Sequence, residues 1–166
     1  VPDGEGMRRS VVKDLRKGMG GAPEPDREFL HQYLTLTRCD LFFADKAVLI
    51  EGTAERILLP AMIRKTDSAA AGQPQLSSQY LTVMEVGGAY AHRFFDLLSF
   101  LELRNLIITD IDAVKPNDGG KRVAVPVAEG LFTSNGCLKA SFGDDVSPEA
   151  LLGKTAAEKT TGIRRI

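Results

Sequence analysis

Three short apolar runs, separated by helix-like stretches, constrain the fold of this 166-residue chain more than any other feature. They lie at 47–50, 80–86 and 103–109 and are rich in Val, Ile, Leu and Met. The first is apolar throughout, which is typical of a strand covered on both faces of a sheet. Strands that alternate with helices in this order are typical of a right-handed parallel sheet. The sequence therefore predicts an α/β fold, with a Rossmann-like parallel sheet flanked by helices.

The first predicted helix follows the strand at 47–50. Thr53 is expected to cap it, and Pro60 is expected to kink or shorten it. The stretch 67–78 contains Ala, Gly, Pro and Ser and is predicted to be an exposed loop. On the first helix, the residues expected on the buried side are the apolar Ile57, Leu58 and Met62.

The second predicted helix follows the Gly87-Gly88 turn, and the third strand comes after it. The apolar side of this second helix is expected to face the core. The residues on that side are Phe94, Phe95, Leu97, Leu98 and Leu101.

Composition shifts along the chain suggest three segments. Residues 1–28 are rich in Gly, Pro and charge and are predicted to be a linker or a partly disordered lead-in, because such a segment buries little apolar area. Residues 29–140 are predicted to form the folded domain, with 115–120 a turn-rich loop and 123–127 an edge strand interrupted by a proline. Residues 141–166 are expected to be a C-terminal tail that begins a truncated helical region.

Charge and cysteine content exclude few classes of protein. The net charge of −1 and the pI near 6.2 argue against a protein that coats nucleic acid by charge alone. A metal-dependent enzyme escapes this objection, because bound cations supply positive charge locally. Cys39 and Cys137 are too few for a disulfide framework and are interpreted as reduced thiols. With no membrane-spanning stretch and no signal peptide in the sequence, we expect a cytoplasmic protein without a membrane partner.

Carboxylates follow two of the three apolar runs. Glu51 comes directly after the first run, and Asp110 and Asp112 follow the third. Because parallel strands end at one edge of a sheet, these groups are expected to converge there, where they repel one another unless a cation sits among them. Glu55 lies near the start of the first helix, where metal ligation and interaction with the helix dipole explain it equally well. The pattern predicts a magnesium-type site acting on phosphate esters, and the competing interpretation is a pair of aspartates that cap the next turn.

Other catalytic arrangements find no support. His31 and His92 have no acidic or thiol neighbours at ligand spacing. No serine lies in a G-x-S-x-G elbow, and the chain has no G-x-x-x-x-G-K-[ST] phosphate loop.

The acidic motifs resemble those of a known domain family. Val48-Leu49-Ile50-Glu51-Gly52 and Ile108-Thr109-Asp110-Ile111-Asp112 resemble the glutamate and D-x-D motifs of a Toprim domain. More narrowly, a set of segments between about Tyr33 and Leu138 is similar to the OLD (overcoming lysogenization defect) family of nucleases. The segments are 41–52, E-G-x-x-E ending at Glu55, Leu58-Leu59-Pro60, Val86-Gly87-Gly88 and Thr133-Ser134-Asn135.

The resemblance implies a metal-dependent DNA endonuclease domain that uses two Mg²⁺ or Mn²⁺ ions. Glu51, Asp110 and Asp112 would be its catalytic residues. The metal ligands would be Glu51, Glu55, Asp110, Asp112 and Ser134. The resemblance further implies DNA as a partner and an ABC-type ATPase domain in the parent polypeptide. ATP would then bind only to that ATPase domain, which this sequence does not include. The resemblance leaves a homodimer open.

Three features depart from the family pattern, one of them the absence of the ATPase domain from this sequence. Gly136 stands where some members have a further acidic ligand, and Lys154 and Lys159 do not match the lysine that assists catalysis in the family. We therefore expect weak or no activity from this segment alone. The alternatives are a non-catalytic Toprim module that binds DNA or a partner, and a D-x-D phosphatase or glycosyltransferase.

Overall fold

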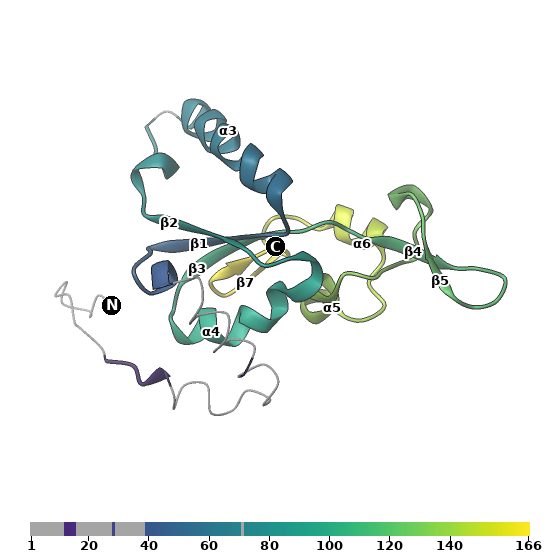
Figure 1. Cartoon of the computed structure of the whole chain (residues 1–166). Coiled ribbons are helices and arrows are strands. Elements are labelled where there is room, and N and C mark those ends of the chain that lie inside the picture. The colour runs from purple at the N-terminus through teal and green to yellow at the C-terminus, as the bar shows by residue number, and fades with distance from the viewer. Residues whose placement is uncertain (1–11, 16–27, 29–38, 71) are drawn as a thin grey trace.

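A mostly parallel sheet organises the part of the chain that the structure describes. The structure is a computed structural model, and it describes residues 12–15, 28, 39–70 and 72–166. Figure 1 shows helix α3 on one face of the sheet, helix α4 on the other, and a hairpin that projects away from the sheet. This arrangement confirms the predicted α/β fold.

The five strands of this sheet come from both ends of the described chain. They run in the order β2-β1-β3-β8-β7. Strands β1, β2, β3 and β8 are parallel, and β7 runs antiparallel to β8. Their bounds are β1 Lys46–Ile50, β2 Leu81–Glu85, β3 Arg104–Ile108, β7 Thr160–Thr161 and β8 Arg164–Arg165. The three predicted apolar runs are thus the three strands β2, β1 and β3.

Helix α3 (Thr53–Ala69) differs from its prediction in three ways. It continues past Pro60 to Ala69, so the proline does not shorten it. The predicted loop consequently starts later and contains the 3-10 turn η2 (Leu76–Ser78). The expected buried side is wrong, because Ile57, Leu58 and Met62 are 71%, 57% and 55% exposed. Leu59 is buried instead, and it packs with Ile63 against Val48, Ile50, Val83 and Ile108.

The opposite face of the sheet carries the main core. The 3-10 segment η3 (Gly88–Phe94) leads into α4 (Phe95–Phe100). Together they occupy the stretch in which the second helix was predicted. As expected, Phe94, Leu97 and Leu98 are fully buried, with Phe95 and Leu101 packed at the margin. The strand residues in this core are Ala47, Leu49, Met84 and Ile107.

A second, three-stranded antiparallel sheet follows β3 directly and has the order β5-β4-β6. Its strands are β4 (Ala113–Pro116), β5 (Arg122–Ala124) and β6 (Phe132–Thr133). The predicted loop at 115–120 therefore begins as a strand and forms the hairpin turn. The predicted edge strand at 123–127 is confirmed in its first part and ends before Pro126, which starts the turn η4 (Val127–Glu129).

The C-terminal stretch is part of the fold. Helices α5 (Gly136–Phe142) and α6 (Pro148–Gly153) follow β6. Helix α6 lies within residues 141–166, where the start of a helical region was predicted. Strand β8 then pairs with β3 through Asn105–Arg164 and Leu106–Arg165. Residues expected to form a tail thus extend the main sheet.

The lead-in at 1–28 lies outside the described residues except for 12–15 and 28, where the Lys13 ammonium donates to the Phe100 carbonyl at 2.6 Å. The 3-10 turn η1 (Cys39–Phe42) precedes β1. Among the described helices, none has the length and hydrophobicity needed to cross a bilayer.

Candidate functional site

The acidic segments meet at the carboxyl ends of β1 and β3. The two strands are parallel neighbours, and their last residues, Ile50 and Ile108, are register partners. Glu51 and Thr109 therefore leave the sheet side by side, which confirms the expected adjacency. In a parallel α/β sheet, this edge is where ligands usually bind.

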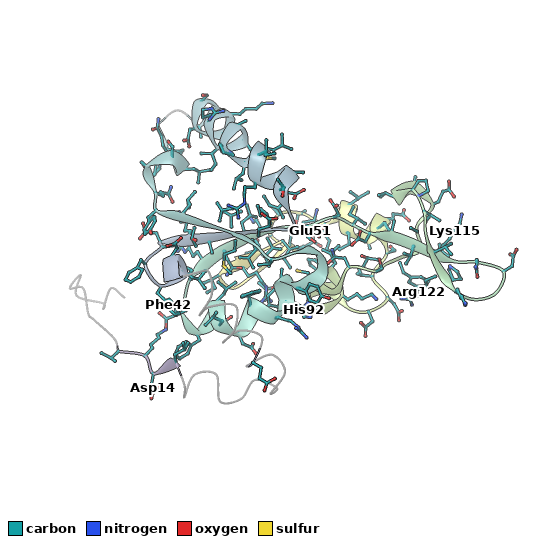
Figure 2. The ribbon with its side chains drawn as sticks, in the orientation of Figure 1. Asp14, Phe42, Glu51, His92, Lys115 and Arg122 are labelled. Atoms are coloured by element: carbon teal, nitrogen blue, oxygen red, sulfur yellow. The ribbon has the colours of Figure 1, made fainter. Side chains whose placement is uncertain are left out.

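The Glu51 carboxylate is held from several directions. Its Oε1 accepts hydrogen bonds from the Thr109 hydroxyl, from the Asp110 backbone N–H at 3.1 Å and from the Asn135 side-chain amide at 3.1 Å. Figure 2 shows Glu51 where β1 meets the start of α3, between the main sheet and the projecting hairpin. These three donors are neutral, so they orient the carboxylate without cancelling its charge.

The D-x-D segment lies between β3 and β4. Asp110 and Asp112 are exposed, and Ile111 between them is half-buried. Asp112 adopts a positive φ of 49°, a conformation that few non-glycine residues take up. At this point the chain leaves the parallel sheet and enters the antiparallel one, so Asp112 marks the junction of the two sheets.

Electrostatics shows that the carboxylates lie near one another. Partial burial raises the pKa of the Asp110 carboxyl above its ordinary value, and the negative charges of Glu51, Asp112 and Glu55 raise it further. Like charges that disfavour ionisation in this way are typical of a site that a cation can stabilise.

Glu55 also caps its own helix. The N-cap of α3 is Gly52 rather than the expected Thr53, and the Gly52 N–H donates to Glu55 Oε2 at 2.9 Å. One carboxylate oxygen therefore stabilises the helix start, while the charge contributes to the field around Asp110. The structure thus supports a role for Glu55 at the helix start, and its role as a metal ligand stays a prediction.

The segment Ser134–Asn135 closes the site from the second sheet. Strand β6 pairs with β4 through Ala113–Thr133, which places Ser134 opposite Asp112. Ser134 donates to the Asp112 carbonyl from its N–H at 2.9 Å and from its hydroxyl at 3.2 Å. The structure thus brings the serine to the D-x-D backbone, with its hydroxyl engaged there.

Asn135 and Thr109 are the site residues that the prediction missed. Asn135 is fully buried and contacts both acidic segments. Thr109 donates to Glu51 and accepts from Asn135 at 2.7 Å. The available signal was the Thr-Ser-Asn tripeptide, in which only the serine was assigned a role, because a buried asparagine cannot be told from an exposed one by spacing.

The carboxylates do not form a ready-made cation cage. Across 39–70, 72–166 and the short described stretches before them, no three carboxylate, imidazole or thiol groups lie close enough to hold one ion together. Asp110 and Asp112 are exposed, and Asp112 Oδ2 accepts a hydrogen bond from the Asn135 amide at 3.3 Å.

Cys137 and His92 are the cysteine and the histidine whose side chains the structure describes. Cys137 is fully buried in the main core as a free thiol, as expected for a small apolar residue. Burial raises the pKa of this thiol to about 11, against a smaller lowering by Arg164, so it stays protonated at neutral pH. His92 is half-buried in η3, while His31 and the Cys39 side chain lie outside the described residues.

The parallel sheet, with a glutamate after β1 and a D-x-D segment after the neighbouring β3, defines a Toprim-type α/β domain. The family described as overcoming lysogenization defect protein-like, TOPRIM domain, matches residues 42–112. This chain therefore contains an OLD-like Toprim domain, at residues 42–112.

A relative supports the same assignment. The chain is 30% identical over 129 residues to a protein named Endonuclease GajA from Bacillus cereus (strain HuB5-5). The alignment covers 77% of this chain and 18% of that protein, so the chain spans a small part of its relative's length. No solved structure matches the chain significantly. The family membership favours a Toprim domain of nuclease type over the D-x-D phosphatase or glycosyltransferase alternative.

Proposed function

We propose that this chain is the nuclease domain of a metal-dependent DNA endonuclease, with Glu51, Asp110 and Asp112 as its catalytic residues. The observation that carries the proposal is the pairing of β1 with β3, which brings Glu51 beside the D-x-D segment. The name of the relative supports hydrolysis of a phosphodiester as the reaction and DNA as the substrate.

The donor set fits hard divalent cations. Glu51, Glu55, Asp110, Asp112 and Ser134 all offer oxygen, which Mg²⁺ and Mn²⁺ prefer. The donors that hold Glu51 are neutral, and neighbouring carboxylates raise the pKa of Asp110, so the site has negative charge to spare. When bound, two such ions would supply an activated water and stabilise the leaving oxygen of the phosphodiester.

The protein's own residues prepare this chemistry. Thr109 and Asn135 fix the direction of the Glu51 carboxylate. The exposed carboxylates of Asp110 and Asp112 would join Glu51 in holding a bound cation. The proposed parent contains an ABC-type ATPase domain in addition, and its assembly as a homodimer remains part of the proposal.

Plasmid cleavage by the full-length parent tests this function. The Asp110→Ala variant should lose Mg²⁺-dependent nicking of supercoiled DNA by about 100-fold or more, the scale expected when a group that stabilises transition-state charge is removed. Asp118→Ala is the matched control, since Asp118 is an exposed aspartate of the hairpin turn, and it should cleave like the wild type. Unchanged cleavage by Asp110→Ala would refute the assignment.

Metal binding by the 166-residue chain separates the nuclease domain from a non-catalytic module. Calorimetric titration with Mn²⁺ should give saturable binding that Glu51→Gln removes. A chain that binds DNA or a partner without chemistry would show no saturable Mn²⁺ binding.

A further inference from the structure

Asn135 occupies an unusual position for a polar residue. It lies between β6 and α5 and is 0% exposed. A buried amide needs partners for both its oxygen and its nitrogen, or it costs stability. Here the two ends of the amide serve different parts of the molecule.

The oxygen end is fixed by helix α5. Asn135 Oδ1 accepts from the backbone N–H groups of Cys137 at 3.0 Å and Leu138 at 3.2 Å. Because only the oxygen can accept these bonds, the amide nitrogen must point the other way. Cys137 and Leu138 are themselves buried, so the core fixes the direction of the amide.

The nitrogen end faces the acidic edge. Asn135 Nδ2 lies 3.1 Å from Glu51 Oε1 and 3.3 Å from Asp112 Oδ2. It also lies 2.7 Å from the Thr109 hydroxyl and 3.1 Å from the Asp110 carbonyl. Two N–H hydrogens are therefore shared among four acceptors, and one side chain joins the ends of β1 and β3 to the start of β4.

We propose that Asn135 is a positioning residue for the metal site, acting through Glu51 and Asp112. This inference rests on the proposed function. The amide holds the Glu51 carboxylate and the D-x-D backbone in one geometry before a cation arrives, so that fewer groups have to be ordered on binding. Removal of such an outer hydrogen-bond partner typically weakens metal affinity by about 10–100-fold.

Mn²⁺ titration of the Asn135→Ser variant tests the proposal. Serine keeps a side-chain oxygen at the N-cap of α5 but has no arm that reaches Glu51. Mn²⁺ should bind at least about tenfold more weakly than to the wild type, again at the scale of an outer-shell partner. The control is Ser147→Ala, which removes the N-cap bond that the Ala150 N–H donates to Ser147 Oγ in α6, a bond that involves neither Glu51 nor the D-x-D segment.

Thermal melting accompanies each titration and separates positioning from capping. The Ser147→Ala variant should melt earlier and keep wild-type Mn²⁺ affinity, which is the result of losing a cap alone. If Asn135→Ser does not fold, Asn135→Thr decides, because threonine also offers a hydroxyl at the N-cap of α5, fills more of the buried space than serine and has no arm that reaches Glu51; it too should bind Mn²⁺ more weakly.

The outcomes distinguish this inference from the proposed function. Wild-type Mn²⁺ affinity in folded Asn135→Ser, or in Asn135→Thr when that variant decides, would overturn the positioning role and leave the metal site standing. A wild-type chain without saturable Mn²⁺ binding would overturn both.

Discussion

The two faces of the main sheet are packed very differently. On the α4 side, a continuous core fully buries large side chains such as Phe94, Leu97 and Leu98. On the α3 side, the fully packed cluster contains only Val48, Ile50 and Leu59. A groove of about 530 Å³ remains beside it, and Leu106 and Ile163 in its lining are each 37% exposed.

The difference shows which side of the sheet supports the site. Parallel strands are normally covered on both faces, and among the residues that the structure describes only the α4 face is covered fully. Asn135 and α5 belong to the packed side through Cys137, which lies in the main core. Asn135, one of the groups that orient Glu51, thus comes from the more fully packed side, whereas the helix that carries Glu55 rests on the thinly packed side.

Alanine substitutions in the two clusters test this difference, and they should have the largest effects. Phe94→Ala should cost about 4 kcal/mol of unfolding free energy, because a fully buried aromatic side chain leaves a large cavity. Leu59→Ala should cost about 2 kcal/mol, the low end for a buried leucine, because its site borders the open groove. Urea unfolding measures both values, and equal losses would contradict the comparison.

Removal of one charge from the acidic edge should have a smaller effect, with opposite sign. Without metal, Asp110→Asn should raise the unfolding free energy at neutral pH by about 0.5 kcal/mol, in the range for closely placed like charges. Because the folded pKa of Asp110 is raised, its favourable contribution exists when the carboxyl is protonated and is lost as pH rises through that pKa.

The gain from Asp110→Asn should accordingly vanish in acid, below the pKa of the unfolded chain. Asp118→Asn, in the exposed hairpin turn, serves as the control and should show no gain at either pH. Urea titrations at neutral and acidic pH would show this, and a destabilised Asp110→Asn at neutral pH would argue that the carboxylates do not repel.

The smallest effect is expected on the outer surface of α3. Leu58 is 57% exposed, so Leu58→Ser should change the unfolding free energy by less than about 0.5 kcal/mol. Thermal melting checks this result. A loss comparable to that of Leu59→Ala would show that the α3 side is packed more fully than the structure has it.

Local sequence patterns predicted the central strands because each is a short apolar run of strand length between helix-like stretches. They failed for α3 because apolar residues surround this helix: Ile57, Leu58 and Met62 form one stripe, and Leu59 and Ile63 form another. Only contacts with the sheet decide which stripe is buried. The strand β8 was missed for a related reason, since two arginines in a short segment carry no strand signal without β3 beside them.

The candidate site was predictable to a similar degree. Glu51 and the D-x-D segment follow adjacent strands, so sheet topology alone brings them together. Asn135 comes from a second sheet whose pairing with β4 depends on contacts distant in sequence. Its role in joining the acidic segments therefore becomes visible only in three dimensions.

Anomalous diffraction from crystals of this chain soaked in Mn²⁺ would test the metal site most directly. The account predicts a manganese peak at the carboxyl ends of β1 and β3, with Glu51 and at least one of Asp110 and Asp112 bound through oxygen at about 2.1 Å, as for a small hard cation. A peak elsewhere on the molecule, with the Glu51 carboxylate turned away from both aspartates, would contradict it.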